Sequence, residues 1–150
     1  MGFDLTQGWL AGMQRQATEL GYKIVVLVVD DEALVRMSAV GLLDDAGYEV
    51  LEAKDADSAL ALLESRADIG LVFTDVEMPG TMDGIGLANV IRARWPTILM
   101  VVASGKAEIN ENRLPSGARF FRKPYADNII VAAMSKMFAA AKGLGPAAAC

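Results

Sequence analysis

The chain has 150 residues, of which 53% are apolar and 22% charged, so it can close one hydrophobic core without disulfides or a structural metal. It has no histidine and a single cysteine, Cys150, which excludes Ser-His and Cys-His catalysis, a phosphohistidine carrier and a zinc site. Fourteen basic and nineteen acidic residues give a net charge of -5, which argues against a nucleic-acid surface.

Two further absences bear on location. No apolar run reaches the length of a membrane span, because the longest, Ile24 to Val29, has the length of a strand. The N-terminus has no basic stretch leading into an apolar one, as a secretion signal would. We therefore expect a cytoplasmic protein that contacts neither membrane nor nucleic acid.

Residues 1–22 are expected to form an N-terminal extension. Trp9, Met13, Ala17 and Leu20 recur at the spacing of one helical face, whereas several glycines weaken the helical pattern. Two alternatives stay open here: a leader without regular structure, and a helix that packs on the domain or pairs two chains.

From Lys23 onward, strand-like and helix-like segments alternate. Five strands are expected, at Ile24–Val29, Glu49–Ala53, Ile69–Thr74, Ile98–Ala103 and Ala118–Phe121. Five helices are expected, from Val35 to Ala46, after a cap at Asp55, after a cap at Asp83, as a short helix at Lys106–Arg113, and from about Asp127.

Five strands alternating with five helices predict an α/β domain, a doubly wound five-stranded parallel sheet with helices on both faces. This domain is expected to span residues 23–140. Residues 141–150 are rich in Gly, Pro and Ala and are expected to form a flexible tail.

Polar side chains stand where four of the five strands end. Asp30 and Asp31 follow the first strand, Asp75 the third, Ser104 the fourth and Lys123 the fifth. Each alone could be a helix cap, a turn residue or a surface charge. Because the carboxyl ends of parallel strands share one edge, where such folds bind ligands, we expect the set to form a site.

The chemistry of that set is specific. Carboxylates brought together without His or Cys favour a hard divalent cation, and Mg²⁺ fits this donor set. A carboxylate beside such a cation can attack a phosphoryl donor and form an acyl phosphate. Lys123 and Ser104 could then bind the phosphoryl oxygens.

These residues resemble the receiver domains of bacterial two-component response regulators. The motifs that carry the resemblance are Val28–Glu32, Asp75–Gly80, Met82–Gly84, Ala103–Gly105 and Lys123–Tyr125. The similarity covers about residues 23–140, and it implies the flavodoxin-like strand order 2-1-3-4-5.

The resemblance implies a role for each matching position at the metal. Asp75 matches the phosphoacceptor. Asp31 matches the carboxylate that binds Mg²⁺ directly and Asp30 the one that holds it through water. The backbone carbonyl of Glu77 matches a third protein ligand.

It also implies the parts of a switch. Ser104 matches the hydroxyl that moves toward the phosphoryl group, and Lys123 the lysine that pairs with that group. Phe120 matches the aromatic residue that changes rotamer together with the hydroxyl.

The implied partners are a sensor histidine kinase or a histidine phosphotransfer protein as donor, and a downstream protein target. About ten residues follow the last helix, so we expect a stand-alone, chemotaxis-type regulator without a separate enzymatic domain.

Three positions depart from the usual pattern. The stretch from Ser104 to Lys123 is short, Tyr125 replaces the more common Phe, and Glu77 places a carboxylate two residues after the acceptor. We predict that Glu77→Ala changes the lifetime of the phosphoryl group.

Two alternatives remain. Phe73–Glu77 faintly resembles the nucleophile motif of haloacid-dehalogenase-type phosphatases, but the order of acidic pair and nucleophile is reversed. A pseudo-receiver, a binding module of the same fold without phosphorylation, is the other alternative.

Overall fold

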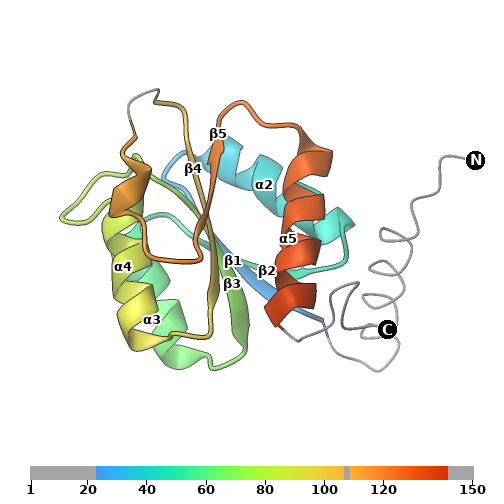
Figure 1. Cartoon of the computed structure of the whole chain (residues 1–150), viewed down its shortest axis with the longest axis horizontal. Coiled ribbons are helices and arrows are strands. Elements are labelled where there is room, and N and C mark those ends of the chain that lie inside the picture. The colour runs from blue at the N-terminus through green and yellow to red at the C-terminus, as the bar shows by residue number, and fades with distance from the viewer. Residues whose placement is uncertain (1–22, 107–108, 142–150) are drawn as a thin grey trace, which may run out of the picture.

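The computed structural model describes residues 23–106 and 109–141, which form a sheet between two layers of helices (Figure 1). The predictions for the extension at 1–22, and for the tail beyond residue 141, lie outside the described residues. Within the described ranges, no helix combines the length and apolarity needed to cross a membrane.

All five expected strands are present. Their bounds are β1 Val25–Val29, β2 Glu49–Ala53, β3 Ile69–Asp75, β4 Leu99–Ser104 and β5 Arg119–Arg122. They pair in parallel in the order β2-β1-β3-β4-β5, which confirms the predicted doubly wound sheet and its strand order. β1 and β3 lie inside the sheet and are almost wholly buried, and in β1 the run of β-branched residues is typical of a strand buried on both faces.

Among the described residues, four α-helices cover the sheet, two on each face (Figure 1). Their bounds are α2 Ala33–Asp45, α3 Ala56–Ser65, α4 Gly84–Arg94 and α5 Asp127–Ala141. α3 and α4 pack on one face, where Leu63 and Ile91 are buried, and α2 and α5 on the other, where Leu43 and Met134 are buried.

Two expected helix caps are confirmed. The Asp55 side chain accepts a hydrogen bond from Ser58 N at 2.8 Å, and the Asp83 side chain accepts one from Gly86 N at 2.8 Å. Each bond satisfies a backbone donor that a helix leaves free in its first turn, so both helices start where the sequence indicates.

The expected helix at Lys106–Arg113 is wrong in the part that the structure describes. A single 3₁₀ turn, Glu111–Arg113, replaces it, and residues 107–108 lie outside the description. Asn110 caps this turn by accepting from Asn112 N, and Pro115 and Gly117 (φ +86°) follow at once. The sheet therefore carries four α-helices among the described residues, not five.

This connection is instead held to α4 by side chains. Asn89 Nδ2 donates to the carbonyl of Arg113 at 3.0 Å, and Arg92 Nη2 donates to the carbonyl of Ser116 at 2.5 Å. Side-chain donors on α4 thus satisfy two backbone carbonyls of the connection and hold it against that helix.

Candidate functional site

The polar strand ends meet at one edge of the sheet. Asp30 directly follows β1, Asp75 and Ser104 are the last residues of β3 and β4, and Lys123 directly follows β5. Asp30 and Asp75 are each only 6% exposed and Ser104 is fully buried. Neither Asp30 nor Asp31 is the N-cap of α2, because Glu32 holds that position and makes no side-chain cap bond.

Three carboxylates form an acidic cluster in this edge. Asp30, Asp31 and Asp75 each place an oxygen within 4.8 Å of the others, a spacing at which one metal ion could bind all three. Asp75 Oδ1 is buried, and Lys123 Nζ lies 3.1 Å from it without the alignment of a regular hydrogen bond. Three clustered carboxylates form an oxygen-only donor set, which fits a hard divalent cation.

Lys123 bridges the two buried carboxylates. Its Nζ lies 3.1 Å from Asp75 Oδ1 and 3.4 Å from Asp30 Oδ2. Burial acts to lower the pKa of Lys123, but the bond to Asp75 and the charges of Asp75 and Asp30 outweigh it, so the pKa is raised. Lys123 therefore stays protonated beside the predicted acceptor.

Burial is also the main influence on Asp75. It raises the pKa of Asp75 to about 6, against the lowering effect of Lys123 and with smaller raising effects from Asp30 and Glu77. The charged form of the Asp75 carboxylate, which predominates at neutral pH, therefore costs free energy in the folded protein. A cation bound to the aspartates would lower that cost.

The backbone around Asp75 is fixed from three sides. Thr74 Oγ1 donates to the carbonyl of Asp75 at 2.9 Å, and Val76 N donates to the carbonyl of Ala103 at 3.0 Å. Gly84, the first residue of α4, donates its N–H to the carbonyl of Val76 at 2.9 Å, and a Cβ at Gly84 would overlap the carbonyl of Asp75. Sequence reasoning gave Gly84 only as part of a motif, although a glycine directly after a capping aspartate is a signal for such close approach.

The side chains of Ser104 and Glu77 form a hydrogen bond that was not predicted from the sequence. Ser104 Oγ donates to Glu77 Oε1 and accepts from Lys106 N at 3.1 Å. Burial acts to raise the pKa of Glu77, but the bond from Ser104 and nearby backbone donors outweigh it, so the pKa is lowered. The role predicted for Glu77 at the metal concerns its backbone carbonyl and stays a prediction, and its carboxylate in addition accepts from the predicted switch hydroxyl.

Phe120 lies within β5, three residues before Lys123. Phe120 pairs in register with Val102, and both side chains pack in the core that α3 and α4 cover. Ser104 follows Val102 by two residues, so its side chain projects from the same face of the sheet. Its ring is half-buried against that core. The position suits coupling to Ser104, and its rotamer change stays a prediction.

Tyr125 packs from the other face. Its ring centroid lies 5.9 Å from that of Phe73, and burial raises the pKa of its hydroxyl. The aromatic ring therefore fills the place expected of a phenylalanine, and the hydroxyl stays protonated.

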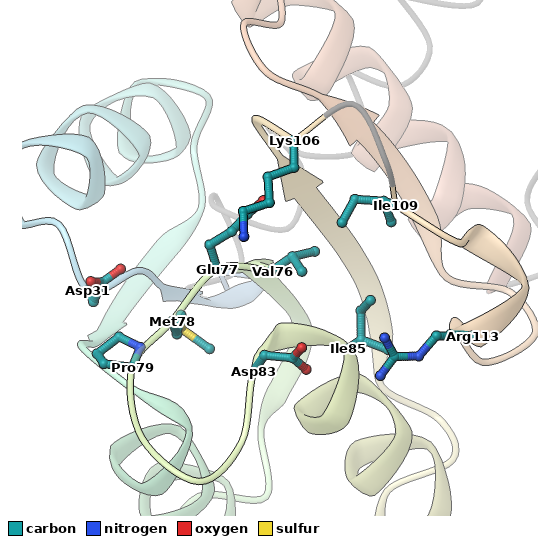
Figure 2. Close-up of a pocket in the computed structure, with 10 residues that line it drawn as sticks. All are labelled: Asp31, Val76, Glu77, Met78, Pro79, Asp83, Ile85, Lys106, Ile109 and Arg113. Atoms are coloured by element: carbon teal, nitrogen blue, oxygen red, sulfur yellow. The ribbon is translucent and has the colours of Figure 1, made fainter.

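A cleft of about 600 Å³ opens beside the acidic cluster. Figure 2 shows the loop after β3 on one side and the connection after β4 on the other, with Glu77 and Lys106 close together at the top of the cleft. Asp31 belongs to both the cleft and the acidic cluster, so the cleft adjoins the predicted metal site.

Comparison with known proteins identifies one family. Its model, the response regulator receiver domain, matches residues 26–135. The nitrogen assimilation regulatory protein NtrX of Azorhizobium caulinodans is 35% identical over 111 residues, which cover 71% of this chain and 24% of NtrX. The sensor kinase CckA of Brucella abortus is 38% identical over 115 residues, which cover 74% of this chain and 12% of CckA.

Solved structures agree with the sequence matches. A response regulator receiver protein from Sinorhizobium medicae superposes with a TM-score of 0.75 at 28% identity, covering 79% of this chain and 97% of that one. The chain thus matches nearly all of a solved receiver, but it spans a quarter or less of NtrX and CckA.

Proposed function

The chain belongs to the response regulator receiver domain family, and from that premise we propose that it takes a phosphoryl group onto Asp75 and thereby switches the binding of a protein partner. The observation that carries the proposal is the buried Asp75 carboxylate, 3.1 Å from Lys123 and within 4.8 Å of Asp30 and Asp31. Nothing in the comparisons favours the phosphatase or the pseudo-receiver, and the chemotaxis-type assignment stays a prediction.

The proposed step transfers a phosphoryl group to an oxygen of Asp75, from an oxygen of acetyl phosphate or from a nitrogen of a phosphohistidine. A carboxylate oxygen of Asp75 attacks the phosphorus of the donor, and the bond from phosphorus to the donor atom breaks, with its electron pair leaving on the donor. Lys123 balances charge on the phosphoryl oxygens, and Ser104 supplies a hydrogen bond to one of them. Hydrolysis of the acyl phosphate by water returns Asp75 to its carboxylate.

Asp31, Asp30, Asp75 and the backbone carbonyl of Glu77 are the proposed ligands of Mg²⁺. When bound there, Mg²⁺ would supply positive charge to the phosphoryl oxygens, in addition to the charge of Lys123. The oxygen-only donor set of the three clustered carboxylates supports this assignment.

The proposed donor is a histidine kinase or a histidine phosphotransfer protein, and the protein is proposed to act as a switch rather than on a separate substrate. The three large apolar residues most exposed in the described chain are Leu34 and Met37 on α2 and Ile129 on α5. These two helices lie on the same face of the sheet (Figure 1), and we propose that their exposed apolar side chains contact the phosphoryl donor. Residues 23–140 are proposed as the domain that carries these functions.

The test is phosphorylation by acetyl phosphate, followed by intact mass spectrometry. With Mg²⁺ the wild type should gain one phosphoryl group, and Asp75→Asn should gain none. Asp57→Asn, on the exposed first turn of α3, is the matched control and should behave as wild type. Chelation of Mg²⁺ with EDTA should suppress the gain.

Other outcomes are equally clear. A phosphoryl group that persists in Asp75→Asn would place the acceptor elsewhere. No adduct and no released phosphate in the wild type would favour the pseudo-receiver. Steady phosphate release from unrelated phosphomonoesters would favour the phosphatase.

A further inference from the structure

The Ser104 hydroxyl has no free proton in this structure. It is fully buried at the end of β4 and donates to Glu77 Oε1. A hydroxyl carries one proton, so a hydrogen bond to Glu77 and one to a phosphoryl oxygen cannot be donated at the same time. The N–H of Lys106, 3.1 Å from Oγ, holds the hydroxyl from the other side.

A phosphoryl group on Asp75 would compete for that proton. It adds nearly two negative charges and three strong acceptor oxygens close to Ser104. The carboxylate of Glu77, two residues along the chain, would be repelled by the same charge. Glu77 therefore stabilises the arrangement in which the Ser104 proton is donated to Glu77 and is not available to the acceptor.

We propose that Glu77 is a positioning residue, a latch that holds the Ser104 hydroxyl until Asp75 is phosphorylated; this rests on the function proposed above. The latch stabilises the unmodified protein and is already open when the phosphoryl group is bound. The hydrogen bond to Ser104 should therefore slow the phosphorylation of Asp75. The predicted effect of Glu77→Ala on the lifetime of the phosphoryl group comes from loss of the carboxylate beside the acyl phosphate, not from loss of this hydrogen bond.

The surroundings of Glu77 suit a side chain that swings away. Glu77 is half-buried in the loop after β3 and lines the cleft of about 600 Å³. Lys106 and Arg113 line the same cleft, so a released carboxylate would meet positive charge there (Figure 2). Opening the latch thus needs no movement of the buried core.

The test compares two substitutions that remove the same charge. Glu77→Ala removes the acceptor for Ser104, whereas Glu77→Gln keeps an amide oxygen that can accept. The rate of phosphorylation by acetyl phosphate should rise about fivefold more in Glu77→Ala than in Glu77→Gln, the factor expected from one net hydrogen bond. Equal rates in the two variants would show that only the charge of Glu77 matters and would overturn the latch.

A double-mutant cycle isolates the contact. In the Ser104→Ala background no hydroxyl remains to be latched, so Glu77→Ala and Glu77→Gln should then give equal rates. A persistent difference would mean that Glu77 acts without Ser104, by directing water or by shape. The rate of dephosphorylation, measured after removal of the donor, should differ little between Glu77→Ala and Glu77→Gln.

Failure of the latch and failure of the proposed function are distinguishable. If the wild type gains no phosphoryl group on Asp75, both fail. If it does, and the cycle is additive, the receiver function stands and the latch is wrong.

Discussion

The bodies of the central strands and their carboxyl ends are equally buried but opposite in chemistry. In β3, Leu71 and Val72 are fully buried among apolar side chains, whereas Asp75, at the end of the same strand, is 6% exposed among charges. Apolar burial stabilises the fold, at about 25 cal/mol per Å². A buried carboxylate costs free energy unless it is paired. One strand therefore supplies stability along its length and reactivity at its tip.

The strand body should give the largest effect on stability. Leu71→Ala leaves a cavity beneath α2 and α5 and should lower the free energy of unfolding by about 3 to 4 kcal/mol in urea denaturation. Phosphorylation by acetyl phosphate should persist under conditions where the variant is folded. Leu34→Ala, at a site that is 81% exposed, is the matched control and should change stability by less than about 0.5 kcal/mol. A comparable loss of unfolding free energy in both variants would contradict the claim that the buried body of β3 stabilises the fold.

Gly84→Ala should affect both properties, because α4 begins directly against the Asp75 carbonyl. The added methyl group must displace α4 or the β3 end, at a cost of about 2 to 3 kcal/mol. Displacement of Asp75 should lower the rate of its phosphorylation by acetyl phosphate more than tenfold, because a shift of about 1 Å in a reacting group lowers reaction rates by that order. Gly41→Ala in α2, where a Cβ meets nothing within 4 Å, is the control, and its phosphorylation rate should equal that of the wild type.

Asp75→Asn should have the smallest and opposite effect on stability. The pKa of Asp75 is raised to about 6 in the folded protein, from 3.8. A raised acid pKa favours the folded state at low pH, and that contribution is lost as pH rises from about 4 through about 6. In EDTA at pH 7, the variant should therefore be more stable than wild type, by on the order of 1 to 2 kcal/mol. The loss of the Lys123 contact is included in that range.

The pH dependence provides the check. Urea denaturation at pH 4 and pH 7 should show the gain of Asp75→Asn shrinking toward zero at the lower pH, and Asp57→Asn should show no such trend. If Asp75→Asn is less stable than wild type at pH 7, the ion pair with Lys123 stabilises the fold by more than the burial of the Asp75 carboxylate destabilises it. The claim that this carboxylate lowers stability would then be wrong.

The sequence alone determined the strands, four of the helices, the strand order, and which polar residues stand at the strand ends. β-branched runs, helical periodicity and the capping residues Asp55 and Asp83 act locally, and the rule for parallel strands brings their carboxyl ends together. Family motifs supplied the order 2-1-3-4-5. The roles of Asp75, Asp31 and Lys123 stay predictions, although the structure places them together.

The tertiary structure alone decided how these groups engage. Glu77 and Ser104 lie 27 residues apart and Lys123 and Asp30 lie 93 apart, so no local pattern encodes either contact. Likewise, the connection after β4 has a single 3₁₀ turn in place of the expected helix among the described residues, and Asn89 and Arg92 on α4 bind two of its backbone carbonyls. Local periodicity fixes which residues reach the sheet edge, but which donor takes which acceptor depends on segments that only folding brings together.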